Sequence, residues 1–178
     1  MGSLAFILQI LANNNGSRKE FPIYKIEEGS DTASEIRFQY PGGIAYNAET
    51  LAVSPKDGSM YVIRKSTGNE NTLYRFPETV EGTVELIEVC NFDDIGTEQI
   101  TGGDIHHLGE KFLIRTYENI YEYHAKDLQD GTVCGNRIRE LAHNEPQGEA
   151  VAYLNKSHSF YSLSERTDQP LYLFTCDK

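Results

Sequence analysis

The chain has 178 residues, of which 39% are hydrophobic, and its formal net charge at pH 7 is −11. This apolar content suffices for one folded domain with a sizeable core and argues against a disordered chain. The excess of acids repels phosphate backbones, so a nucleic-acid partner is not expected. The acidic surface suits a cation or a basic partner, although we favour the interpretation that it serves solubility alone.

The N-terminal segment 4–12 is apolar except for Gln9. It is far too short to span a bilayer, so no membrane span is expected. It also lacks the basic start of a signal peptide. Two interpretations stay open, a buried strand and the remnant of a secretion signal, and we favour the strand.

A repeated pattern of the form apolar-Tyr-x-apolar marks the chain at Tyr24, Tyr74, Tyr121 and Tyr172, at intervals of 50, 47 and 51 residues. Each copy indicates a strand buried on both faces. A period of roughly 50 residues is typical of the blades of a β-propeller. The sequence therefore predicts an all-β fold, a partial β-propeller of about three and a half four-stranded blades.

The repeat divides one partial propeller domain, 1–178, into blade pieces 1–40, 41–90, 91–142 and 143–178. Inner hairpins are expected at 48–64, 102–117 and 148–165, and outer strands at 34–40, 84–90 and 136–142. Glycine-bearing segments at 41–43, 101–103 and 146–148 would carry the chain from one blade to the next. The residues expected to be buried between blades are Leu51, Val53, Val62, Ile105, Phe112, Ile114, Val151 and Phe160.

Propellers usually close with about four to eight blades, so this arc is incomplete. Either the chain is a piece of a longer product, which we favour, or another chain completes the arc. Open blade edges and an apolar flank would favour self-association. An unidentified protein or a small molecule is expected at one face of the disc.

Three acids are expected at one end of the inner hairpins, where a propeller has the mouth of its central channel. Hairpin register places Glu49 opposite Arg64, Asp104 opposite Arg115, and Glu149 opposite Ser164 or Glu165. Carboxylates gathered there would suit Ca²⁺.

The alternative for the first two acids is a local ion pair with the facing arginine, and we favour it. Glu149 and Glu165 form the better cation site, because two neighbouring carboxylates without a basic partner repel each other.

The remaining chemistry-bearing residues form no recognisable motif. His106 and His107 face opposite ways along a strand, whereas His124, His143 and His158 lie in loops or at strand ends without a matching cluster. Serine-hydrolase, zinc-protease and phosphate-loop patterns are absent. Cys90, Cys134 and Cys176 have no metal-ligand spacing, so one disulfide with a free thiol and three reduced thiols are both open.

Several segments together resemble a family of uncharacterised, mostly bacterial secreted β-propeller proteins: NAETLAVSPKDGSMYVIRK, ITGGDIHHLGEKFLIRTYENIYEY, PQGEAVAYLNKSHSFYSLSER and PLYLF. The resemblance implies a six-bladed type of propeller and an extracellular or periplasmic location, and it carries no settled activity. Segment 13–18 resembles the family's GDN…R segment, with the acid missing here.

A more distant resemblance links Gln147-Gly148-Glu149-Ala150 and Ser164-Glu165 to the phytase-like and lactonase-type propellers. Those proteins bind calcium at the channel and hydrolyse phosphate or lactone esters. Two hypotheses follow for this chain. The first is a non-catalytic, extracytoplasmic binding or scaffold module, and the alternative is a calcium-dependent hydrolase that is complete only in a longer parent chain.

Overall fold

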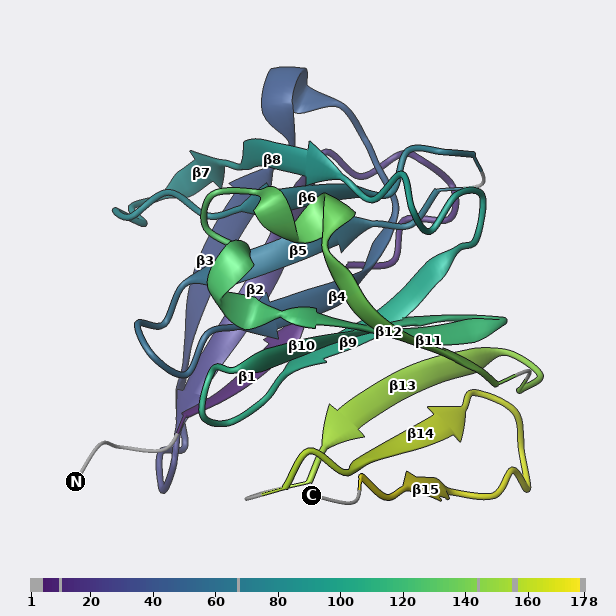
Figure 1. Cartoon of the computed structure of the whole chain (residues 1–178). Coiled ribbons are helices and arrows are strands. Elements are labelled where there is room, and N and C mark those ends of the chain that lie inside the picture. The colour runs from purple at the N-terminus through teal and green to yellow at the C-terminus, as the bar shows by residue number, and fades with distance from the viewer. Residues whose placement is uncertain (1–4, 10, 67, 144, 155–156, 177–178) are drawn as a thin grey trace.

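The computed structural model describes residues 5–9, 11–66, 68–143, 145–154 and 157–176. Its elements are strands, apart from three short 3-10 turns, η1 (Pro41–Gly43), η2 (Ala125–Asp127) and η3 (Thr132–Gly135). The all-β prediction is therefore confirmed. The strands form four separate sheets that follow one another along the chain (Figure 1).

Each sheet consists mainly of strands that are consecutive in sequence. The first contains β1 (Ala5–Gln9), β2 (Glu20–Glu27), β3 (Ala33–Gln39) and β7 (Thr83–Glu85). The second contains β4 (Ala48–Val53), β5 (Met60–Arg64), β6 (Thr72–Arg75) and β8 (Ile87–Asn91). The third contains β9 (Ile100–Ile105), β10 (Lys111–Thr116), β11 (Asn119–His124) and β12 (Arg137–Ala142). The fourth contains β13 (Gly148–Tyr153), β14 (Phe160–Ser164) and β15 (Tyr172–Phe174).

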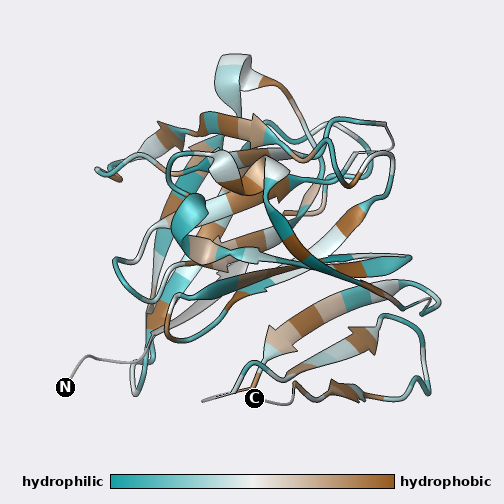
Figure 2. Ribbon diagram, in the orientation of Figure 1, coloured by the Kyte–Doolittle hydropathy of each residue, from teal (hydrophilic) through white to brown (hydrophobic). Residues whose placement is uncertain are grey.

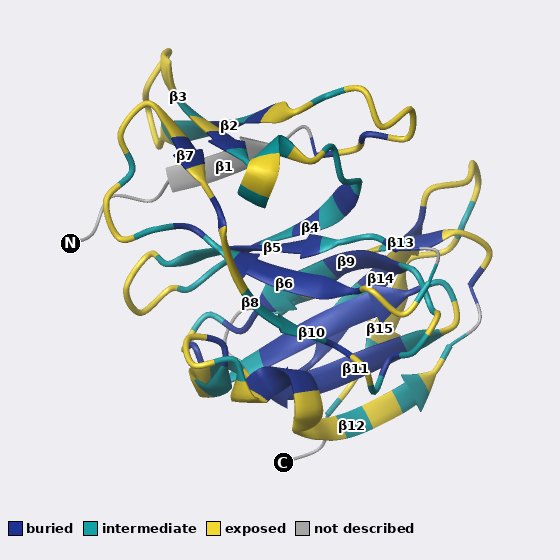
Figure 3. Cartoon of the chain, turned by 90° about the horizontal axis from the view of Figure 1, so that it is seen from above, coloured by how far each residue is buried: buried dark blue, intermediate teal, exposed yellow. Residues whose placement is uncertain are grey.

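The second, third and fourth sheets meet along their first strands. Strand β9 packs against both β4 and β13, and the view from above shows these three strands next to one another (Figure 3). The fourth sheet lies beneath the third (Figure 1). The beginnings of three successive sheets are thus gathered at one place in the molecule.

Alternate side chains of the middle strands pack against different neighbouring sheets. Val62 joins the cluster shared with the first sheet, whereas Ile63 joins the cluster shared with the third. On β10, Ile114 faces the second sheet and Leu113 faces the fourth. Both faces of these strands therefore carry apolar residues. Figure 2 shows the hydrophobic residues, in brown, along the strands of the sheets.

Most residues expected between sheets are buried, with two exceptions. The buried ones are Val62, Ile105, Phe112, Ile114, Val151 and Phe160. Leu51 and Val53 are only half-buried, whereas Thr50 and Ala52 are buried. Strand β4 approaches β9 so closely that a Cβ atom on Gly103 would lie 2.9 Å from the Thr50 methyl carbon. This close approach requires small side chains, so the bulkier Leu51 and Val53 lie on the other face.

The prediction of a single outer strand at 84–90 is wrong, because this segment is divided between two sheets. Strand β7 runs parallel to β3 of the first sheet, and β8 pairs with β6 of the second. Val84 and Leu86 are buried in the apolar cluster between the first two sheets. Val89 and Cys90 pack against the cluster between the second and third sheets. The segment therefore crosses from one interface to the next.

A disulfide joins Cys90 of β8 to Cys134 of η3, which connects the second sheet to the segment before β12. Cys176 is free. Of the two states that the sequence left open, the structure has one disulfide and one thiol.

The outward face of the fourth sheet is apolar and uncovered. Ala150 pairs with Leu163, and Tyr161 pairs with both Ala152 and Leu173, so these side chains share one face. Leu163 is 39% exposed and Leu173 is 51% exposed. An exposed apolar flank was expected from the sequence, and the structure has one here. Among the described residues there is no helix of the length and apolarity that crossing a membrane requires.

Candidate functional site

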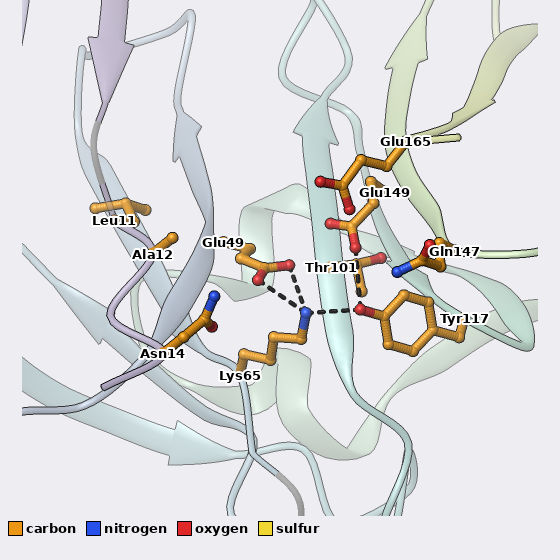
Figure 4. Close-up of a pocket in the computed structure, with 10 residues that line it drawn as sticks. All are labelled: Leu11, Ala12, Asn14, Glu49, Lys65, Thr101, Tyr117, Gln147, Glu149 and Glu165. Carbon is orange, nitrogen blue, oxygen red and sulfur yellow. Dashed lines mark hydrogen bonds and ion pairs between the residues drawn. The ribbon is translucent and has the colours of Figure 1, made fainter. Parts of the chain in front are cut away.

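The first strands of the second, third and fourth sheets each contain a β-bulge at the same point. The extra residue is Glu49 in β4, Thr101 in β9 and Glu149 in β13. A bulge bends the strand and turns a side chain away from the regular pleat. All three residues line one cavity of about 630 Å³ (Figure 4).

The second strands of the same hairpins supply the facing residues. Lys65, Tyr117 and Glu165 each follow directly after the last residue of β5, β10 and β14, and all line the cavity. The remaining lining residues are Leu11, Ala12, Asn14 and Gln147. The repeat of the fold therefore places six side chains from equivalent positions around one pocket.

A chain of hydrogen bonds connects four of these side chains. The Lys65 ammonium donates to both carboxylate oxygens of Glu49 at 2.8 Å and to the Tyr117 hydroxyl at 2.8 Å. The Tyr117 hydroxyl in turn donates to Glu149 Oε1 at 3.0 Å. The Lys65 ammonium also lies 4.9 Å from the centre of the Tyr117 ring, within the range of a cation–π interaction. The arrangement is visible in Figure 4.

The electrostatics of the pocket make Glu149 a group that titrates near neutral pH. Burial raises the pKa of Glu149 to about 7, with further contributions from a hydrogen bond with Glu49 and from the charge of Glu49. Burial lowers the pKa of Lys65, but Glu49 and Tyr117 outweigh it, so the net shift is upward. Lys65 is thus held charged, whereas Glu149 exchanges a proton around pH 7 and can either donate or accept a hydrogen bond.

The predicted pairing of Glu49 with Arg64 is wrong because of the bulge. Ala48 lies opposite Arg64, and Glu49 instead binds Lys65. Arg64 forms an ion pair with Glu70 at 2.6 Å, and its guanidinium lies 4.0 Å from the centre of the Tyr46 ring. Glu49 itself does line the pocket, at the end of the hairpin where the sequence placed it.

The predicted pairing of Asp104 with Arg115 is also wrong, because the turn of this hairpin is centred one residue earlier. Asp104 lies opposite Leu113. Its carboxylate accepts the backbone N–H of Tyr153 at 2.8 Å, which ties β9 to β13. Burial raises the pKa of Asp104. Asp104 therefore lies between the third and fourth sheets and is not one of the residues lining the pocket.

Arg115 is fully buried and forms an ion pair with Glu145, with 3.2 Å between Nη2 and Oε2. Its other terminal nitrogen donates to the backbone carbonyls of Asn119 and His143. Burial lowers the pKa of Arg115, and the Glu145 charge opposes this effect. Glu145 was not singled out from the sequence, since it precedes β13 and gives no local signal of a partner 30 residues away.

Two carboxylates that line the pocket, those of Glu149 and Glu165, offer oxygen ligands to a cation. The amide of Gln147 lines the pocket as well, but its oxygen accepts a hydrogen bond from Arg166 at 3.0 Å. Glu149 lies opposite no residue because of its bulge, while Gly148 pairs with Ser164. Glu49 is engaged by the Lys65 ammonium, which takes the place that a metal ion would need.

Comparison with known proteins adds little beyond the fold. No family model matches the chain, and no curated protein matches it. Among solved structures it is similar to Raptor from Chaetomium thermophilum, with a TM-score of 0.51 and 14% sequence identity. The likeness covers 90% of this chain and 15% of that chain. At this identity the likeness concerns the all-β fold alone, and the resemblance to secreted bacterial propellers stays a prediction.

Proposed function

We propose that the four sheets are successive blades of an incomplete β-propeller arc. Three observations support this: a repeat of roughly 50 residues, sheets packed face to face, and first strands β4, β9 and β13 that lie together. In a closed propeller these first strands line the central channel. The uncovered apolar face of the fourth sheet would then meet a further blade, supplied by the same or another chain.

We propose that this arc is a non-catalytic binding module whose ligand enters the pocket at the ends of the first strands. The observation that carries the proposal is the repeated placement of Glu49, Lys65, Tyr117, Glu149 and Glu165 around one cavity. A volume of about 630 Å³ lies within the range of small-molecule sites. The pocket contains three carboxyl groups and one ammonium group, so it favours a small polar ligand with a positively charged amine.

The disulfide supports an extracytoplasmic location. Disulfides persist in oxidising compartments such as the periplasm and the extracellular space, and they are rare in the cytosol. The bond between Cys90 and Cys134 joins two sheets of the fold. We therefore propose that the module acts outside the cytoplasm.

The binding proposal is tested by thermal melts with small primary amines and with neutral alcohols of the same size. We expect amines to raise the melting temperature of the wild type, and we expect Glu149→Gln and Glu165→Gln to abolish the shift. Glu81→Gln is the matched control, because it removes the same charge from an exposed site outside the pocket. Equal shifts for amines and alcohols, or for pocket and control variants, would contradict the proposal.

A calcium-dependent hydrolase is the second candidate, favoured by the chemistry of Glu149. A carboxyl that titrates near pH 7 is suited to proton transfer, and Glu149 and Glu165 offer oxygens that Ca²⁺ prefers. Phosphomonoester and lactone assays with and without millimolar calcium test it. Calcium-dependent turnover that Glu149→Gln abolishes would support a hydrolase, and no turnover of either substrate class would count against it.

A further inference from the structure

The opposite ends of the inner hairpins hold a second cluster of chemistry-bearing side chains. The turn between β9 and β10 contributes His106 and Glu110, and the turn before β14 contributes His158. These turns lie at the far end of the strands from the bulges that form the pocket. We propose that His106, Glu110 and His158 together bind a zinc ion.

The distances between the three side chains suit a tetrahedral metal. One ligand atom from each residue lies within 4.8 Å of the others. His158 Nε2 is 3.1 Å from Glu110 Oε2, and His106 Nδ1 is 3.9 Å from the same oxygen. Zinc bonds of about 2.0–2.2 Å in tetrahedral geometry place neighbouring ligand atoms roughly 3.3 Å apart. Small side-chain rotations therefore complete the site.

The surroundings of His106 orient it as a ligand. Its side chain is buried, and Nε2 lies 3.2 Å from the carbonyl oxygen of Ser157. A proton on Nε2 that is donated to this carbonyl leaves the Nδ1 lone pair facing Glu110. Metal-binding histidines characteristically donate their second nitrogen to such a group. The backbone N–H of Leu108 approaches Nδ1 at a long 3.4 Å, and the metal would replace this contact.

The chemistry of the three ligand atoms also favours zinc. A neutral imidazole is the form that binds metal. Two imidazole nitrogens and one carboxylate oxygen suit zinc better than calcium or magnesium, which prefer oxygen ligands alone.

Bound zinc would connect the turns of two neighbouring sheets and leave a fourth position for water. Without the metal, the same residues form an ordinary hydrogen bond between Glu110 and His158, beside the ring contact of His158 with His106. The two interpretations differ in whether zinc stabilises the fold. A ligand that binds only the folded state raises the melting temperature, by an amount that grows with the logarithm of the free ligand concentration relative to its dissociation constant.

The test is a thermal melt of the full chain with and without zinc chloride. With zinc at a hundredfold excess over its dissociation constant, we expect the melting temperature to rise by about 5–10 °C. His158→Ala and Glu110→Gln should abolish most of this rise; both positions are at least partly exposed, so both variants should fold. His124→Ala is the matched control, because it removes an exposed histidine outside the cluster.

Cobalt(II) provides a second readout of the same site. Tetrahedral cobalt absorbs strongly in the visible range, and we expect this absorption in the wild type and in His124→Ala but not in His158→Ala. A wild type with no zinc-dependent rise would overturn the proposal. An equal rise in His158→Ala and the control would overturn it as well, since it would show binding elsewhere on the acidic surface.

Discussion

The interface between the second and third sheets and the interface between the third and fourth are held together by different forces. The first contains a large apolar cluster, with Ile63, Phe112 and Ile114 among its fully buried members. The disulfide between Cys90 and Cys134 adds a covalent connection. The second interface has a smaller apolar cluster of Leu113, Ile120, Val151 and Phe160.

Buried polar groups also connect the third and fourth sheets. Arg115 and Glu145 form a buried ion pair there, and Asp104 accepts the backbone N–H of Tyr153. The Thr101 hydroxyl donates to the Gly148 carbonyl at 2.6 Å. The histidine cluster lies at one end of this interface, and the pocket lies at the other end, where Glu49 and Lys65 from the hairpin of the second sheet also line it. The comparison indicates that apolar packing and a disulfide hold the first interface, whereas the second depends more on buried hydrogen bonds and an ion pair.

The largest effect is expected from breaking the buried ion pair. Glu145→Gln leaves the Arg115 charge buried without its partner, so we expect a loss of about 3–5 kcal/mol in the free energy of unfolding. Urea denaturation measures it. Glu35→Gln is the control, because Glu35 pairs with Arg37 at the exposed surface, and its loss should stay below about 1 kcal/mol. Similar losses in the free energy of unfolding for both variants would show that Arg115 and Glu145 do not form a buried ion pair.

The disulfide should have the next largest effect. Cys90 and Cys134 are separated by 44 residues, and closing a loop of that length typically contributes about 2–4 kcal/mol. We expect the double replacement of both cysteines by alanine to lower the free energy of unfolding by this amount. Cys176→Ala should leave it nearly unchanged, because that thiol is free. Unchanged stability after reduction of the wild type would contradict this prediction.

Asp104 tests the interface between the third and fourth sheets at a single hydrogen bond. Asp104→Ala removes the acceptor of the Tyr153 N–H and should cost about 1–3 kcal/mol. Asp104→Asn keeps an acceptor oxygen and removes a charge that burial disfavours, so its cost should be much smaller. Because the pKa of Asp104 is raised in the folded state, ionisation costs stability as pH rises through that pKa. The wild type should therefore lose free energy of unfolding as pH rises, whereas Asp104→Asn should not. Relative to the wild type, the variant should be most stable at high pH, and urea denaturation at pH 4 and pH 8 measures the difference.

Replacing Glu149 by glutamine should have the smallest effect, which is a change in how the free energy of unfolding depends on pH. Its folded pKa of about 7 exceeds the unfolded value of 4.5, so its favourable contribution is fully present below the unfolded value. That contribution is lost as pH rises through 7. Wild type should lose more stability between pH 5 and pH 8 than Glu149→Gln, by less than about 1 kcal/mol because the carboxyl is partly exposed. Identical pH profiles would contradict this.

The strands and hairpins were predictable because their signals are local. The tyrosine repeat and the alternation of apolar residues place β4, β9 and β13 and their partner strands close to where the structure has them. The register was not predictable, because one bulged residue at Glu49 changes its partner from Arg64 to Lys65. A turn centred one residue earlier likewise separates Asp104 from Arg115.

Contacts between distant segments were missed for a related reason. His158 gives no sign in the sequence that it lies beside His106, because the contact depends on how two sheets pack. The sequence did give a weak signal for Lys65 and Tyr117, because each directly follows the second strand of an inner hairpin. Because these positions are equivalent in successive repeats, their side chains could have been expected to lie close together at one end of the hairpins.

The most direct test of the pocket is a carbon-13 NMR titration of the glutamate carboxyl groups, with Glu149 assigned by Glu149→Gln. In the structure, Glu149 is partly buried and lies near Glu49. The Glu149 carboxyl should then titrate with an apparent pKa of about 7. In Glu49→Gln its pKa should fall toward the usual value. A wild-type Glu149 that titrates near 4.5, unchanged by Glu49→Gln, would show that the two carboxyl groups do not share a partly buried site.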